Sequence, residues 1–113
     1  FTIERITKLN CNLVKQTLSK YIKNKITFKK PNDLIIKKKK ICGILQEKIN
    51  KFNNDYFIVG IGINLIKSPA IKDYPTTNLK ELINKDISKK KIEIELKKIF
   101  ENSLNKLLKK GYN

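Results

Sequence analysis

Residues 56–65 read Tyr-Phe-Ile-Val-Gly-Ile-Gly-Ile-Asn-Leu, and this stretch decides the fold class. It is apolar on both faces of an extended chain, a pattern that predicts the most buried strand of a sheet. Gly60 and Gly62 each weaken a buried strand, by roughly 0.5–1 kcal/mol relative to alanine. We therefore expect a flat ligand to lie directly on this backbone, with the amide of Asn64 reading its polar edges. A dinucleotide fingerprint is excluded, because its third glycine, following helix and later ribose-binding acid are missing.

Amphipathic helices are expected on both sides of this strand in the chain. Apolar residues recur at helical spacing over residues 6–22 and again over 92–108, where Gly111 should end the second helix. Asn78, with Glu81 three residues later, predicts the cap of a short helix that runs through Ile83.

Shorter strand patterns precede residue 56. In chain order we expect a strand at 26–29, a Pro-Asn-Asp turn at 31–33, a strand at 34–36, an exposed turn of four lysines at 37–40, a strand at 41–49 and a polar loop at 50–55. A helix, then strands, then two helices predict an α+β fold, with helices packed on a mostly antiparallel or mixed sheet.

The composition fits one modest soluble domain. With 113 residues, 40% of them apolar, the chain can build a single core. No run approaches the roughly 18 apolar residues of a membrane span, and the start at Phe1 has no signal-peptide layout. We expect a cytoplasmic protein, or one cut from a longer chain, that does not contact membranes.

Cysteine and histidine content narrows the chemistry. Only Cys11 and Cys42 occur, both in apolar surroundings, which favours two buried reduced thiols over a disulfide or a zinc site. The chain has no histidine, so histidine-based catalysis and histidine metal ligands are excluded. Any chemistry therefore rests on Lys, Asp, Glu, Asn and backbone groups.

The net charge of +16 raises the question of nucleic-acid binding. Arg5 is the only arginine, although the planar arginine fork suits base-edge contacts better than lysine does. The lysines also run evenly along the chain. A generic basic surface with non-specific polyanion binding fits better than specific nucleic-acid recognition. A non-catalytic basic module that binds nucleic acid or an acidic partner remains an alternative function.

Two further motifs precede the glycine strand. Residues 29–34 read Lys-Lys-Pro-Asn-Asp-Leu, where a cation, a tight turn and a carboxylate could hold a phosphate and its magnesium. Residues 39–47 read Lys-Lys-Ile-Cys-Gly-Ile-Leu-Gln-Glu, where a lysine entering a strand can reach an anion and Gly43 lets a ligand approach the backbone. Taken alone, the first is better explained as a hairpin turn and the second as a solvated lysine turn with a glycine bulge.

In this order, Lys-x-Pro-Asn-Asp, Lys-x-x-Gly-Ile-Leu-x-Glu and Gly-Ile-Gly-Ile-Asn resemble the biotin–protein ligase family over nearly the whole chain. The resemblance implies the later part of a catalytic domain akin to lipoate ligases and class II aminoacyl-tRNA synthetases. Residues 1–113 would then be a single, incomplete domain. It lacks the glycine- and arginine-rich biotin loop, which precedes this segment in the family, and the small C-terminal barrel. Lys30 also stands where the family usually has an aromatic residue.

The resemblance also implies an activity. Family members use ATP and Mg²⁺ to activate biotin as biotinyl-AMP and transfer it to a lysine of the biotin carboxyl carrier protein of a carboxylase such as acetyl-CoA carboxylase. A lipoate ligase relative is the other enzyme alternative. Without the glycine- and arginine-rich loop, the chain alone is expected to be inactive. A sheet edge exposed by the loss of the preceding strands would favour a homodimer.

The same resemblance assigns roles to individual residues, from catalysis to adenylate binding. It implies Lys40 as the catalytic lysine that meets the biotin carboxylate and the adenylate phosphate, with Gly43 and Leu45 beside biotin. Lys29, Asn32 and Asp33 would lie at the ATP phosphates, with Asp33 on magnesium. Gly60, Gly62 and Asn64 would lie under the adenylate, with Asn64 facing adenine.

Overall fold

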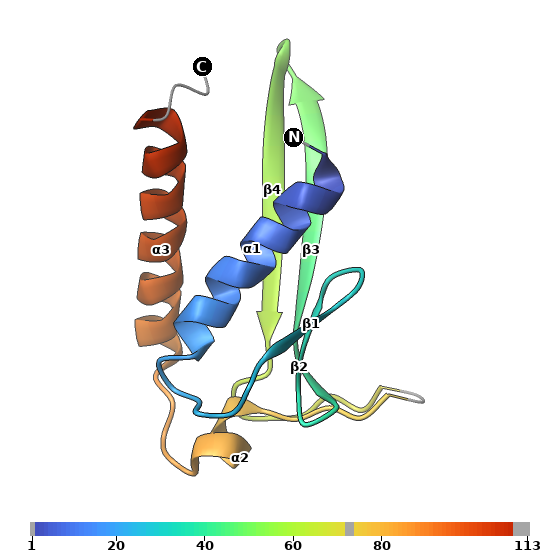
Figure 1. The fold of residues 1–113 in the computed structure, drawn as a ribbon, viewed down its shortest axis with the longest axis vertical. Helices are drawn as coiled ribbons and strands as arrows, with labels where there is room; N and C mark the ends of the chain where they lie inside the picture. Colours follow the sequence, from blue (N-terminus) through green and yellow to red (C-terminus); the bar gives the residue numbers. More distant parts are fainter. Residues whose placement is uncertain (1, 72–73, 110–113) are drawn as a thin grey trace.

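The computed structural model describes residues 2–71 and 74–109. It shows a four-stranded antiparallel sheet with long helices packed against it (Figure 1). In chain order the elements are α1 (Ile3–Leu18), β1 (Thr27–Lys29), β2 (Asp33–Ile36), β3 (Lys39–Lys51), β4 (Asn54–Ile63), α2 (Leu79–Ile83) and α3 (Lys89–Lys109). The predicted α+β class and antiparallel pairing are confirmed. Gly111, expected to end the last helix, lies outside the described residues.

The strands follow one another across the sheet in the order β1-β2-β3-β4. One row of paired residues runs Phe28, Leu34, Cys42 and Ile63, and it faces the helices. Because successive residues in a strand point to opposite faces, the neighbouring rows face away from the helices. We call that second side the open face of the sheet.

Helix α1 lies across the other face and supplies much of the core. Thr2 caps it, because its hydroxyl oxygen accepts a hydrogen bond from the Arg5 N–H at 3.1 Å. Val14 and Leu18 are fully buried. The core that they join draws on β2, β3 and the helices, and partly buried side chains of β1 and β4 pack against it. It includes Ile26, Leu34, Ile36, Ile41, Cys42, Ile44, Leu79 and Ile92.

Two predicted connections are shorter in the structure. The turn of four lysines contains only Lys37 and Lys38, both with left-handed backbone (φ 51° and 64°), and β3 already begins at Lys39. The polar loop at 50–55 is likewise a two-residue turn at Phe52 and Asn53. Positive φ at both central residues matches the right-handed twist of antiparallel strands, so each turn joins its strands directly.

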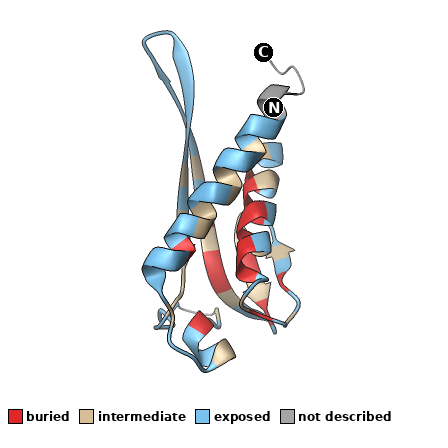
Figure 2. Ribbon diagram, turned by 90° about the vertical axis from the view of Figure 1, so that its left-hand side faces the viewer, coloured by how far each residue is buried: buried red, intermediate tan, exposed pale blue. Residues whose placement is uncertain are grey.

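The prediction that residues 56–65 form the most buried strand is wrong. β4 is an edge strand of the sheet, and its side chains from Asn54 to Ile58 are all exposed. Figure 2 shows the β3–β4 hairpin projecting beyond the helices, with burial confined to its lower part. The stretch is apolar, but burial depends on which elements cover a strand. The helices cover only one end of β4.

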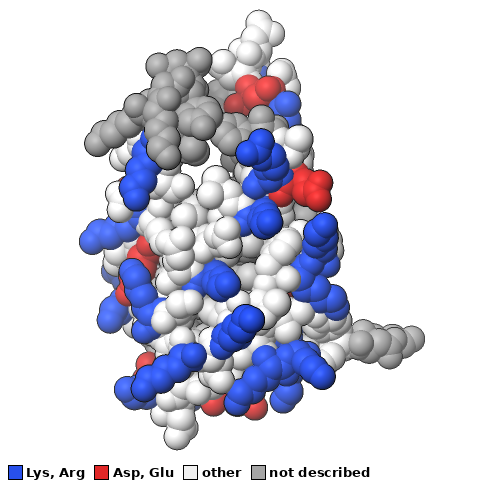
Figure 3. All heavy atoms as spheres, in the orientation of Figure 1, with Lys and Arg blue, Asp and Glu red and all other residues white. Residues whose placement is uncertain are grey.

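The surface agrees with a diffuse basic charge. On the face drawn in Figure 3, Lys and Arg side chains are scattered among uncharged surface, without gathering into a single stripe. None of the described helices combines the length and apolar character needed to cross a membrane.

Candidate functional site

Three glycines leave a bare patch of backbone on the open face. Gly43 of β3 pairs with Gly62 of β4, and Leu45 pairs with Gly60. A Cβ added at Gly62 would meet only the Gly43 carbonyl oxygen at 3.7 Å, and one at Gly60 would meet Leu45 at 3.7–3.8 Å. The fold therefore has room for side chains at Gly60 and Gly62, so their absence keeps the surface of the strands free for another molecule.

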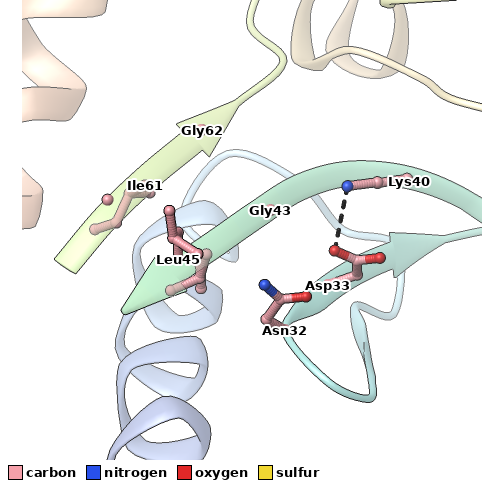
Figure 4. Close-up of a pocket in the computed structure, with 9 residues that line it drawn as sticks. Asn32, Asp33, Lys40, Gly43, Leu45, Ile61 and Gly62 are labelled. Atoms are coloured by element: carbon pink, nitrogen blue, oxygen red, sulfur yellow. Dashed lines mark ion pairs between the residues drawn. The ribbon is translucent and has the colours of Figure 1, made fainter. Parts of the chain in front are cut away.

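Gly43 has a tighter environment, because a charged pair lies over it. Lys40 Nζ is 3.2 Å from Asp33 Oδ1, and a Cβ at Gly43 would come within 3.3 Å of Lys40 Cε and Nζ (Figure 4). Asp33 opposes Gly43 across the β2–β3 pairing. A glycine at position 43 thus lets the Lys40 side chain fold across the sheet to reach Asp33.

The backbone of Lys40 is fixed from the opposite side by the loop that follows β4. Its N–H donates to the Pro75 carbonyl at 2.9 Å, and its carbonyl accepts from the Thr77 N–H at 2.9 Å. The Asn64 side chain donates from Nδ2 to the carbonyls of Lys40 (3.3 Å) and Thr77 (3.1 Å). This network links the end of β4 to the start of β3 and restrains the base of the Lys40 side chain.

Together these groups surround an open pocket of about 440 Å³. Its charged lining residues, among those that the structure describes, are Asp33 and Lys40, with side-chain exposures of 18% and 25%. Polar, glycine and apolar residues complete the lining, and these are Asn32, Gly43, Ile44, Leu45, Gly60, Ile61 and Gly62. An elongated ligand could place an apolar part against Leu45 and an anionic part at Lys40.

Most of the predicted site residues meet in this pocket. The structure brings together Asn32, Asp33, Lys40, Gly43, Leu45, Gly60 and Gly62, which come from three separate motifs. The predictions about what each residue binds stay predictions.

Lys29 and Asn64 do not line that pocket. The Lys29 ammonium lies 4.0 Å from the centre of the Tyr74 ring, and both residues line a second concavity of about 510 Å³. Lys29 nevertheless pairs directly with Asp33, so its backbone is one strand away from the first pocket. Asn64 uses its amide group to hold the loop rather than to line the pocket.

Sequence reasoning missed the loop residues that support the site. Pro75 and Thr77 bind the Lys40 backbone, and Tyr74 packs against the Lys29 ammonium. Pro69 and Pro75 are typical of irregular structure, but no local pattern indicates that this loop returns to the start of β3, more than thirty residues earlier in the chain.

The two cysteines take no part in this pocket. Both are free and buried, as predicted. Burial in apolar surroundings raises the pKa of Cys11 to about 11 and that of Cys42 to about 12. Both thiols are therefore protonated and unreactive at neutral pH.

Comparison with known proteins adds to this geometry. The model of the biotin/lipoate A/B protein ligase family matches residues 2–64, which is more than half of the chain and includes all three motifs. This chain belongs to that family. Its α+β sheet with packed helices also matches solved biotin protein ligases.

Several solved structures have the same fold over most of the chain. Apo biotin protein ligase from Aquifex aeolicus is 26% identical, with a TM-score of 0.74 over 93% of this chain and 47% of that one. The same ligase in complex with biotin and ATP is 25% identical, with a TM-score of 0.76 over 94% and 45%. P. falciparum LipL1 in complex with lipoate is 20% identical, with a TM-score of 0.64 over 95% and 33%. The chain thus spans about half the length of the A. aeolicus ligase.

Proposed function

We propose that this chain is the adenylate-binding part of a biotin–protein ligase. The observation that carries the proposal is the bare glycine surface of β3 and β4 with the Lys40 ammonium at its end, since it can accept a flat acyl-adenylate and its anionic centre together. The match to a ligase that binds biotin and ATP supports this choice of ligand.

In the proposed mechanism, an oxygen of the biotin carboxylate attacks the α-phosphorus of ATP. The bond from that phosphorus to the oxygen bridging to the β-phosphate breaks, and pyrophosphate leaves. Lys40 would neutralise the carboxylate and the negative charge that develops on the phosphate. A neutral lysine amine of biotin carboxyl carrier protein then attacks the acyl carbon, AMP leaves, and the nitrogen loses a proton.

The remaining pocket residues would position the two substrates. Gly43 and Leu45 would contact biotin, and Gly60 and Gly62 would lie under the adenylate. Lys29 could serve the phosphates only after leaving Tyr74, because its ammonium now lies over that ring. Asn64 would act indirectly, by fixing the Lys40 backbone, and a direct contact with adenine is a separate part of the proposal.

Magnesium fits this donor set as an ion held jointly with a phosphate. The Asp33 carboxylate and the Asn32 amide line the pocket, whereas the described residues contain no group of three or more Asp, Glu, Cys or His that could hold a metal alone. Mg²⁺ commonly binds through one or two carboxylates plus substrate phosphates and water. Bound there, it would neutralise phosphate charge.

Nuclear magnetic resonance can test the proposed ligand even if it binds weakly. Biotinyl-5′-adenylate at millimolar concentration should shift the backbone amide signals of Gly43, Gly60 and Gly62. Gly62→Val should abolish these shifts while keeping a cooperative melt, because its side chain would fill the pocket but meets no close atom of the fold. Unshifted glycine signals in the wild-type chain would refute the proposal.

Lipoyl-5′-adenylate in the same titration tests the second candidate. The matched family includes biotin and lipoate ligases, and the LipL1 fold is shared. We expect weaker shifts than with the biotinyl compound, because the ordered motifs fit the biotin branch. Stronger shifts would assign the chain to lipoate instead. Binding only to polyanions such as RNA, with a steep salt dependence, would favour the basic-module alternative.

We also propose that residues 1–113 alone do not biotinylate a carrier protein, either in the cytoplasm or in vitro. The pocket is open on the side away from the sheet, so water could hydrolyse an acyl-adenylate held there. Incubation with biotin, ATP, Mg²⁺ and carrier, followed by mass spectrometry, should show no biotin-sized mass gain. A rate like that of a full-length ligase would contradict this. Light scattering would show whether the free edge of β4 forms a homodimer.

A further inference from the structure

The two opposite charges that line the pocket, those of Lys40 and Asp33, are already paired with each other in the absence of a ligand. Lys40 and Asp33 are in contact at 3.2 Å, and among the described lining residues they are the charged ones. A free carboxylate or phosphate entering the pocket would therefore approach a lysine that already has a counter-ion. It could bind Lys40 only by displacing Asp33 or by coming close to the Asp33 carboxylate, and both weaken its attraction.

The position of Asp33 makes this competition direct. Asp33 Oδ1 would lie 3.7 Å from a Cβ on Gly43, so the carboxylate projects over the glycine surface where the ligand is expected. Figure 4 shows the Lys40 ammonium turned toward Asp33 across this surface. The backbone of Lys40 is held by the Pro75 and Thr77 loop, so only the flexible part of its side chain can change partner.

A divalent cation at Asp33 would reverse the balance. It would neutralise the carboxylate and repel the Lys40 ammonium, which could then turn to the ligand. The Asn32 side chain in the same lining offers a second oxygen. The formal charge contributed by the pair and the cation together would be positive, whereas that of the pair alone is zero.

We propose that Asp33 is the built-in counter-ion of Lys40, and that the pocket takes an anion together with a divalent cation in preference to the free anion. The proposal rests on the proposed function for the identity of the anion, but the coupling between cation and lysine depends only on the Asp33–Lys40 contact. By linkage, the cation must strengthen anion binding by the same factor as the anion strengthens cation binding.

The cation alone provides a test that needs no biotin. Mn²⁺ broadens the resonances of nearby amides, so a titration reports its affinity at Asp33 and Gly43. Lys40→Met should bind Mn²⁺ about two- to fivefold more tightly than the wild type, the range expected when a partly exposed ion pair is removed. Asp33→Asn should lose broadening at both positions.

A second ion pair supplies the matched control. Lys48 and Asp55 are 3.4 Å apart at the far end of the hairpin, outside the pocket lining. Lys48→Met changes the net charge by the same amount as Lys40→Met, and it should leave Mn²⁺ affinity at Asp33 unchanged. Equal affinities in Lys40→Met and the wild type, or no Mn²⁺ broadening at Asp33 in either, would overturn the proposal.

The reciprocal measurement uses biotin as the anion. Without divalent cations, Asp33→Asn should bind biotin about two- to fivefold more tightly than the wild type, and Mg²⁺ should strengthen binding only in the wild type. Tighter binding by the wild type without Mg²⁺ would overturn the proposal. The expected Mn²⁺ result without any biotin binding would support the coupling and count instead against biotin as the ligand.

Discussion

The two ends of the β3–β4 hairpin differ in almost every physical respect, although the same two strands form both. At the root, which we define as residues 40–46 with 59–64, Cys42 and Ile44 are buried and the open face carries the glycine pocket. At the tip, residues 47–58, Tyr56, Phe57 and Ile58 are 44–50% exposed and Phe52 is 83% exposed. Apolar content is similar at both ends, so it is the cover from the helices that separates them.

This difference shows how one hairpin can combine a rigid site with an uncovered apolar surface. On the helix side, a groove of about 410 Å³ between α1, α3 and β4 is lined mainly by apolar side chains, including Ile6, Phe57 and Phe100. The root has a buried core beneath it and a fixed loop at its end. We expect stability to depend on the root and to be nearly indifferent to the tip.

The largest contrast should come from the same substitution at both ends. Ile44→Ala removes a side chain that is 1% exposed and should destabilise the fold by about 2–5 kcal/mol. Ile58→Ala removes one that is 50% exposed and should change stability by about 0.5 kcal/mol or less. Urea denaturation of both variants measures this. Equal losses would mean that the tip is buried in solution, for example in a dimer.

A smaller contrast is expected between two asparagines. Asn64→Ala leaves the carbonyls of Lys40 and Thr77 without their side-chain donor and should cost about 1–3 kcal/mol. Asn50→Ala removes an exposed hydrogen bond to Asp55 at 2.9 Å and should have little effect. The thermal melts of the two variants should differ accordingly. Loss of stability in Asn50→Ala alone would reverse our assignment of the rigid end.

The smallest expected effect is a pH dependence confined to the tip. The hydrogen bond from Asn50 and the charge of Lys48 lower the pKa of Asp55. A lowered folded-state pKa means that this contribution is present above the unfolded pKa of about 3.9 and is lost as pH falls through the folded value. The protection of the tip amides, measured as the ratio of the intrinsic exchange rate at each pH to the observed rate, should therefore fall below about pH 4 in the wild type. In Asp55→Asn this pH dependence should be absent.

Local chemistry made much of the fold predictable. The Pro31–Asp33 turn and the Asn78 cap rest on contacts within a few residues, and the structure confirms both, the latter through a 2.8 Å hydrogen bond from the Glu81 N–H to Asn78 Oδ1. The helical stripe of α1 was equally clear, because its apolar residues repeat along one face.

Features set by distant parts of the chain were not predictable in the same way. The exposure of β4 depends on how far the helices reach along it, and no property of residues 56–65 encodes that reach. Lys29 was expected at the pocket, but its ammonium lies over Tyr74, which is 45 positions later in the chain. The convergence of the pocket residues was predicted only because three motifs were considered together.

The two buried thiols can serve as native probes of local unfolding. Cys11 on α1 and Cys42 on β3 are 1% and 0% exposed and belong to the same core cluster. With pKa values of about 11 and 12, these thiols should not react with maleimides or disulfide reagents until α1 separates from the sheet. The rate at which the thiols are modified would thus report how often α1 separates from the sheet, without any added label. A cysteine introduced at Phe52 would react at once, so fluorophores can be attached to the tip with both native thiols in place.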